Sequence, residues 1–178
     1  MKALLIASLA ALAGFGLYAT QNRAQSNGEP EKIGGIPVTN KSPQRKDKVV
    51  KTDAQWKAQL TDQQYRILRA KGTEAAFCGG HLNNHEEGVF SCVGCGLPLF
   101  KSDAKFESGT GWPSFFQPYN QENIWLKADD SYGMHRIEVL CARCDGHLGH
   151  VFDDGPSDKT GLRYCINGDI LTFKKSGN

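Results

Sequence analysis

Two short cysteine pairs constrain the fold of this 178-residue chain more than any other feature. Cys92 and Cys95 form the first pair, Cys141 and Cys144 form the second, and 45 residues separate the pairs. Two residues between cysteines let one tight turn present both sulfurs to one ion, and the glycine that follows each pair helps such a turn to form. Four thiolates match the tetrahedral coordination of structural Zn²⁺, so we expect one zinc ion per chain.

Other uses of these four cysteines remain open from the sequence. Exported domains often contain disulfides, and iron also accepts sulfur ligands. A thioredoxin-like redox site is a weaker match, because it needs one CxxC pair at the start of a helix. The chain has six cysteines, so the zinc interpretation leaves Cys78 and Cys165 outside the metal site.

The pattern around the cysteine pairs is typical of a β-rich domain. Between residues 88 and 175, short apolar runs are separated by Gly, Pro and Asp, which predicts an antiparallel β body. Before it, capping-box patterns at Thr52 and Thr61 predict short helices over 53–60 and 62–70. The net charge of +2 is too small to indicate nucleic-acid binding.

Cys165 lies in the stretch 161–168, which we interpret as containing a short β-strand. Side chains alternate faces along a strand, so Arg163, Cys165 and Asn167 are expected on one face. A cation beside a thiol lowers the thiol pKa and favours the reactive thiolate, which predicts a nucleophile. A buried structural cysteine is the alternative, because free cysteines are among the most buried residues.

Candidate partners for this thiol precede it in the chain. His147 and His150 are three residues apart, and one could supply a proton while the other orients it or holds water. The same pair could instead serve as extra metal ligands. Trp112 follows a glycine and precedes a proline, where its ring can form the wall of a pocket for a small apolar group, unless it simply packs in the core.

These motifs together resemble the methionine sulfoxide reductase B family. The resemblance covers about residues 52–174 and is specific because several separate motifs agree in order and distance. They are the two CxxC pairs, Gly-Thr-Gly-Trp-Pro-Ser-Phe at 109–115, His-Leu-Gly-His-Val-Phe at 147–152 and Arg-Tyr-Cys-Ile-Asn at 163–167.

The resemblance implies a mainly β fold of two antiparallel β-sheets with short N-terminal helices, stapled by a zinc site of four cysteines. It implies reduction of methionine-R-sulfoxide, in proteins or free, with Cys165 attacking the sulfoxide sulfur and becoming a sulfenic acid. The other implied roles are an acid and a water-positioning group (His147, His150), electrostatic and hydrogen-bonding partners (Arg163, Asn167), and a substrate pocket (Trp112, Phe152).

The second thiol is where the chain departs from one common form of the family. Many members carry a cysteine inside the Gly-x-Gly-Trp-Pro loop, and this chain has Thr110 there. Cys78 is the remaining candidate, so we expect it to resolve Cys165 as a disulfide that thioredoxin or a thioredoxin-like reductant then reduces. The Gly79–Gly80 pair after it would supply the necessary flexibility.

Two rival functions remain. An exported, zinc-stapled β module could bind a partner without catalysis, although it would not need Cys165, His147, His150 and Trp112 together. A Cys-His hydrolase or acyltransferase could use Cys165 as nucleophile and His150 as base, although Cys78 would then be idle.

The N-terminal part divides into two regions before the catalytic domain at 52–178. Residues 1–20 carry Lys2 and then an uncharged, mostly apolar run, which predicts a signal peptide or a retained membrane anchor. Residues 21–51 are polar and partly basic, and we expect a linker that cannot order itself. The protein would then be exported to a periplasmic or other extracytoplasmic space, with a membrane as an optional partner. We expect a monomer.

Overall fold

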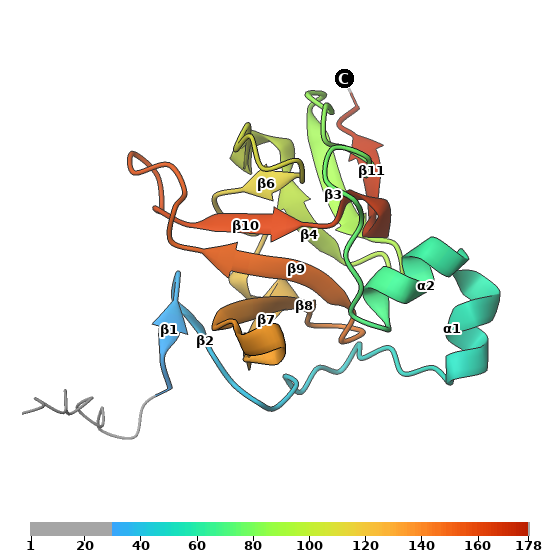
Figure 1. Ribbon diagram of the computed structural model, residues 1–178. Helices are drawn as coiled ribbons and strands as arrows, with labels where there is room; N and C mark the ends of the chain where they lie inside the picture. Colours follow the sequence, from blue (N-terminus) through green and yellow to red (C-terminus); the bar gives the residue numbers. More distant parts are fainter. Residues whose placement is uncertain (1–29, 178) are drawn as a thin grey trace, which may run out of the picture.

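A six-stranded antiparallel sheet forms the centre of the molecule (Figure 1). The structure is a computed structural model that describes residues 30–177. The strand order is β5-β6-β10-β9-β8-β7, so the segment that carries Cys165 lies inside the sheet. The strands are β5 (Lys105–Phe106), β6 (Ser114–Phe115), β7 (Ile124–Asp129), β8 (Arg136–Cys141), β9 (His147–Phe152) and β10 (Arg163–Ile166).

A smaller sheet of order β11-β3-β4 packs against the first. Its strands are β3 (Gly88–Cys92), β4 (Pro98–Lys101) and β11 (Leu171–Lys175). Three buried rings join the two sheets: Phe115 of β6 stacks on Phe100 of β4, with ring centroids 4.3 Å apart, and contacts Phe90 of β3 edge-on at 5.2 Å. The predicted fold of two antiparallel sheets is confirmed.

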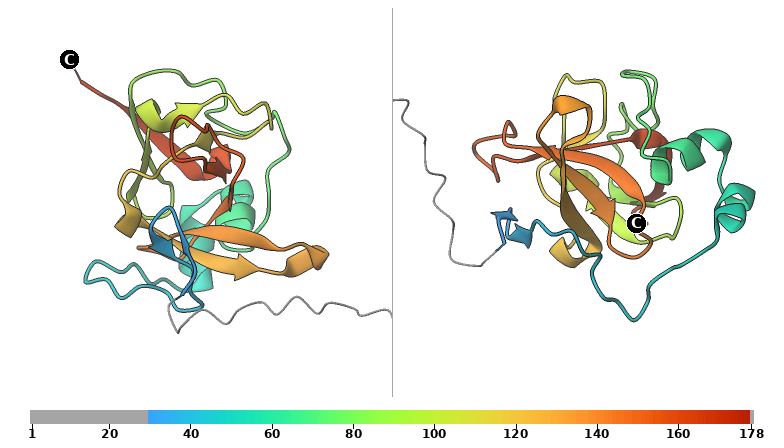
Figure 2. Two further views of the ribbon diagram at one scale, coloured as in Figure 1. Left: turned by 90° about the vertical axis from the view of Figure 1, so that its left-hand side faces the viewer. Right: turned by 60° about the horizontal axis from the view of Figure 1, so that its bottom comes forward.

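Two short helices precede the sheets and lie side by side at one end of the molecule (Figures 1 and 2). They are α1 (Asp53–Gln59) and α2 (Asp62–Leu68), and both predicted capping boxes are formed, at Thr52 and Thr61. Four single-turn 3₁₀ helices lie in the loops: η1 (Ser102–Ala104), η2 (Gln121–Asn123), η3 (Ser131–Gly133) and η4 (Gly168–Ile170).

The segment 30–51, which belongs to the expected polar linker, packs against the folded domain. It contains a hairpin of β1 (Lys32–Ile33) and β2 (Ile36–Pro37), and then runs along the molecule past β7 towards α1 (Figures 1 and 2). Ile36 is 4% exposed, and Val38 forms a parallel bridge with Leu126 of β7. A few apolar residues and backbone pairing to an exposed sheet edge therefore order a segment whose overall composition is polar.

Within residues 30–177 no helix is long and apolar enough to cross a membrane. The predicted signal peptide or anchor, residues 1–20, lies outside the described residues.

Candidate active site

The four CxxC cysteines meet in one cluster. All four Sγ atoms lie within 4.8 Å of one another, with Cys92 and Cys144 at 3.7 Å and Cys95 and Cys141 at 3.5 Å. A disulfide bond would require about 2.05 Å, and all six cysteines of the chain are free. Tetrahedral zinc with bonds of about 2.3 Å places its sulfurs ~3.8 Å apart, so the cluster fits the ion. The histidine pair is not part of the cluster among the described residues.

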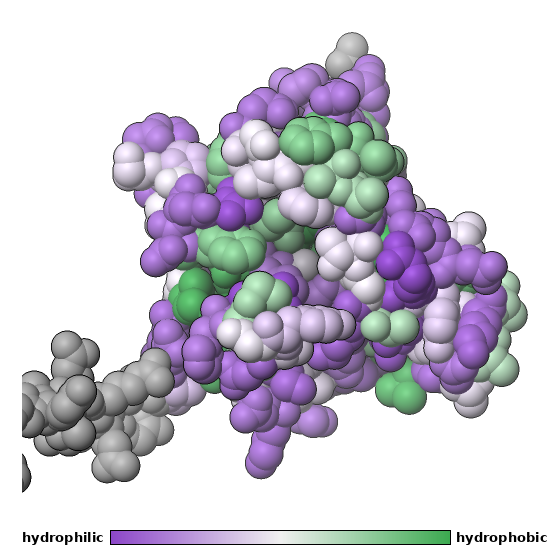
Figure 3. All heavy atoms as spheres, in the orientation of Figure 1, coloured by the Kyte–Doolittle hydropathy of each residue, from purple (hydrophilic) through white to green (hydrophobic). Residues whose placement is uncertain are grey.

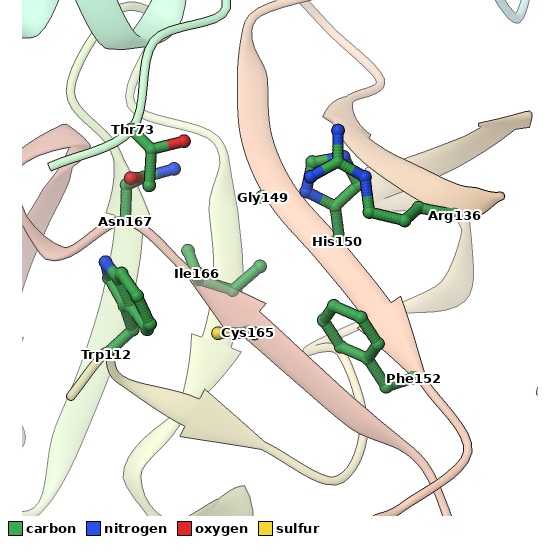
Figure 4. A pocket seen from close by; sticks show the side chains of 9 residues that line it. All are labelled: Thr73, Trp112, Arg136, Gly149, His150, Phe152, Cys165, Ile166 and Asn167. Atoms are coloured by element: carbon green, nitrogen blue, oxygen red, sulfur yellow. The ribbon is translucent and has the colours of Figure 1, made fainter. Parts of the chain in front are cut away.

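Cys165 faces a separate pocket of about 140 Å³. Figure 4 shows its sulfur between the ring of Trp112 and that of Phe152, with Asn167 at one end and His150 on the neighbouring strand. The remaining lining residues are Thr73, Arg136, Gly149 and Ile166. On this side of the molecule, apolar surface gathers over the middle, where Figure 1 shows β9 and β10, and hydrophilic residues surround it (Figure 3).

Strand register brings the thiol and the histidines together. Cys165 of β10 pairs directly with His150 of β9. Val139 of β8 pairs with Gly149 of β9, but the next residue, Leu140, pairs with His147. Leu148 is therefore the extra residue of a β-bulge in β9. In a regular strand, His147 and His150 would point to opposite faces; across this bulge their rings lie 5.4 Å apart.

The pKa of Cys165 is raised, because burial disfavours the thiolate. The charge of Arg163 and a hydrogen bond with Thr110 lower it, but only in part. Arg163 therefore lowers the pKa of the Cys165 thiol, as the sequence predicts, but burial has the larger effect and the pKa is raised overall. The sequence indicated the cation correctly but did not reveal how deeply the thiol is buried.

Arg163 is oriented by an acidic residue that the sequence did not single out. Its Nε and one terminal nitrogen each donate to Asp154 at 2.8 Å, and the guanidinium lies 4.5 Å from the centre of the Phe152 ring. The hydrogen bond to Asp154 raises the pKa of Arg163, and the same contact lowers the pKa of Asp154. Arg163 is buried beside the pocket and is not among its lining residues in the described chain.

His150 is held from behind by Asp129 of β7. Its Nε2 lies 2.8 Å from Asp129 Oδ2, and Arg136 donates to the same oxygen at 2.7 Å. Burial opposes ionisation of Asp129, but hydrogen bonds from Ser131 and His150 outweigh it and hold the pKa of Asp129 well below its usual range. The carboxylate therefore accepts, and Nε2 carries the hydrogen. Burial lowers the pKa of His150 despite Asp129, so the neutral ring offers Nδ1 as an acceptor.

His147 lies deeper and has a different partner. Its Nδ1 is 2.8 Å from Oε1 of Glu138, a carboxylate only 2% exposed, and Lys71 donates to the other oxygen of Glu138 at 2.7 Å. Burial would raise the pKa of Glu138, but the hydrogen bonds from His147 and Lys71 lower it overall. This buried ionic group positions His147 behind His150.

Comparison with known proteins agrees with this geometry. The chain matches the SelR domain over residues 60–175. It is 55% identical over 127 residues to a protein of Herminiimonas arsenicoxydans named peptide methionine sulfoxide reductase MsrB, which covers 71% of this chain and 92% of the relative. Two further proteins have the same name and are similarly close. The one from Thiobacillus denitrificans is 56% identical, over 69% of this chain and 92% of the relative. The one from Leptospira interrogans is 55% identical, over 71% of this chain and 96% of the relative. The chain belongs to the methionine sulfoxide reductase B family.

Thr110 occupies the loop position where many members of the methionine sulfoxide reductase B family carry a cysteine. Its side chain hydrogen-bonds the Cys165 thiol, and its hydroxyl lies 2.8 Å from that of Ser108. Ser108 in turn lies 2.7 Å from Ser114, the residue opposite Cys165 on β6. A polar hydroxyl group therefore stands beside the Cys165 thiol.

Cys78 lies outside the pocket among the described residues and is exposed. The loop that carries it is fastened to η4, which follows β10, by Glu74, a carboxylate 3% exposed that accepts from the N–H groups of Gly168 at 2.6 Å and Asp169 at 2.8 Å. A Cβ at Gly79 would lie 2.0 Å from Glu74, so this glycine permits close packing. Burial raises the pKa of Glu74, and the two backbone hydrogen bonds offset this only in part.

Glu74 also joins three parts of the pocket. Its backbone carbonyl accepts from Trp112 Nε1 at 3.2 Å, and its backbone N–H donates to Asn167 Oδ1 at 3.0 Å. Asn167 is fixed further by a 2.9 Å bond to the Leu148 carbonyl. Glu74, Glu138 and Asp129 were not predicted from the sequence. No local pattern marks them, because their partners lie on other strands or turns.

Proposed function

We propose that this chain reduces the R epimer of methionine sulfoxide, in proteins and as the free amino acid, with Cys165 as the nucleophile. The observation that carries the proposal is the free Cys165 thiol in a small pocket between two aromatic rings. The apolar walls suit the methyl and methylene groups of the substrate, and the polar end suits its oxygen.

The chemistry begins with a proton transfer. The pKa of Cys165 is raised and that of His150 is lowered, so the resting pair is a thiol and a neutral imidazole. We assign to His150 the uptake of the thiol proton, directly or through one water, and its delivery to the sulfoxide oxygen. Arg163 stabilises the thiolate in between by its charge.

The thiolate then attacks the sulfoxide sulfur. As the sulfur–oxygen bond of the substrate breaks, the protonated oxygen is transferred to Cys165, which becomes a sulfenic acid, and methionine leaves. Asp129 keeps the His150 ring oriented throughout, and Asn167 holds the turn after the nucleophile in place. Trp112 and Phe152 exclude water around the reacting sulfur.

Recycling is assigned to Cys78. Its thiol attacks the sulfenic acid, water leaves, and a Cys78–Cys165 disulfide forms; thioredoxin or a thioredoxin-like dithiol then reduces it by exchange. Because Cys78 lies outside the pocket, the loop anchored by Glu74 must open for this step. The four-cysteine cluster is assigned to structural Zn²⁺, which would hold the β3–β4 and β8–β9 turns together.

Export remains part of the proposal. The apolar run at residues 1–20 supports an extracytoplasmic location, as a cleaved signal peptide or an anchor. The residues of a single chain form the pocket, which supports a monomer that acts on oxidised proteins. The binding module without catalysis is not favoured, because the chain belongs to an enzyme family and has its reactive cysteine in a pocket.

A pair of assays tests the proposal. With dithiothreitol, the purified protein should reduce N-acetyl-methionine-R-sulfoxide and leave the S epimer unchanged, and Cys165→Ser should be inactive. With thioredoxin as reductant, Cys78→Ser should lose turnover while its dithiothreitol-dependent activity remains. Activity of Cys165→Ser on the R epimer would refute the nucleophile, and full thioredoxin-dependent turnover by Cys78→Ser would refute the resolving role.

A further inference from the structure

The hairpin of β1 and β2 has a fixed position although it lies outside residues 60–175, where the chain matches the SelR domain. Ile36 belongs to the hydrophobic core, and the Val38 N–H donates to the Glu31 carbonyl at 2.7 Å. The N–H of Thr39 donates to Leu126 of β7 at 2.9 Å. These contacts hold the hairpin at the edge of the six-stranded sheet.

This hairpin forms one wall of a groove beside the catalytic pocket. Glu31 and Ile33 line the groove, which has a volume of about 660 Å³. Phe152 and Arg136 also line it, and both line the Cys165 pocket as well. Figure 4 shows these two side chains on the side of the pocket that β8 and β9 form. The groove therefore adjoins the pocket and is several times larger.

The charge of the groove suggests what it binds. Its lining includes three carboxylates, those of Glu31, Asp130 and Asp153, although the whole chain carries a net charge of +2. The lining also includes His135, whose Nδ1 lies 2.6 Å from Asp130 Oδ1, and Arg136, which donates to the Asp129 carboxylate at 2.7 Å. The carboxylates of Glu31 and Asp153, together with the apolar side chains of the lining, therefore suit an extended chain that carries a cation.

We propose that this groove binds the residues that flank the oxidised methionine in a polypeptide, and that it favours a lysine or arginine among them. The inference rests on the proposed function, because it places the sulfoxide in the adjoining Cys165 pocket. A free amino acid would occupy only that pocket. The hairpin would therefore determine preference among polypeptide substrates.

Two matched peptides test the preference, with dithiothreitol as reductant. One is acetyl-Lys-Ala-Met(R-O)-Ala-Lys-amide and the other replaces both lysines by glutamate. The full-length protein at low salt should show a kcat/KM about threefold to tenfold higher for the lysine peptide, through KM, because exposed ion pairs are weak. The ratio should approach one in about 0.5 M salt. It should also fall in the Glu31→Gln/Asp153→Asn double variant and remain in Glu87→Gln, an exposed control in the bend just before β3.

Equal kcat/KM for the two peptides, or a ratio that the double variant leaves intact, would overturn the proposal. A preference that appears only after proteolytic removal of the residues before 30 would assign the groove to this chain's own leading segment and would also overturn it. Acetyl-methionine-R-sulfoxide amide, which has no flanking residues, separates the two proposals: if it is not reduced, the proposed function fails, whatever the peptides show.

Discussion

Replacing Glu74 by glutamine should loosen the Cys78 loop. The carboxylate accepts from two backbone N–H groups, at 2.6 and 2.8 Å, and is almost fully buried. Glutamine keeps one acceptor oxygen but turns an NH₂ group towards the second N–H. Loss of a hydrogen bond to a charged acceptor costs about 1.5–3 kcal/mol, and the backbone N–H group left without an acceptor adds to this cost. The neutral amide is easier to bury, which offsets part of the loss, so we expect about 2 kcal/mol.

Urea unfolding at pH 7 under reducing conditions measures this cost, with Glu87→Gln as the matched control. The control makes the same chemical change at an exposed residue and should shift the free energy of unfolding by less than about 0.5 kcal/mol. A local readout is chymotrypsin cleavage after Phe77, which is 68% exposed on the same loop. Opening made easier by about 2 kcal/mol should raise the cleavage rate about 30-fold. If neither stability nor cleavage changes in Glu74→Gln, the carboxylate does not fasten the loop.

Three further predictions follow from the site. Thr110→Cys in a Cys78→Ser background should restore thioredoxin-dependent turnover, because the Thr110 side chain already contacts the Cys165 thiol; continued inactivity would contradict that contact. Iodoacetamide should alkylate Cys165 in the Cys78→Ser protein at a rate that still rises above pH 9, because the thiol pKa is raised; a plateau near pH 7 would contradict it. Lys48→Met removes hydrogen bonds to the Ala142 carbonyl (2.9 Å) and to Asp145 (2.8 Å) of the second CxxC turn. It should therefore speed zinc release to a chelator severalfold, relative to Lys46→Met at an exposed control residue.

The basic segment before the helices has an unexpected structural role. Lys48 reaches the second CxxC turn, and Asp47 accepts from Arg143 at 2.8 Å. Arg143 also donates to the Cys95 carbonyl at 3.2 Å, which links the two cysteine pairs. The segment therefore supports the four-cysteine cluster from outside the residues that match the SelR domain.

The sequence determined the parts of this protein that depend on local chemistry. CxxC spacing predicted the four-sulfur cluster, because two intervening residues define one turn. The capping boxes predicted where both helices begin, because the capping contacts span only three residues. The motif around Cys165 predicted the short strand that carries it, and the family resemblance implied that Trp112, His150 and Asn167 share its pocket, which all three line.

Only the tertiary structure decided the features that depend on long-range neighbours. Glu74, Asp129 and Glu138 act on groups that separate strands bring close, so no spacing in the sequence indicates them. The β-bulge at Leu148 places both histidines on one face, against simple alternation. The protonation of Cys165 is the clearest case. The sequence indicated the cation that lowers its pKa, but burial by distant parts of the chain has the larger effect and raises it.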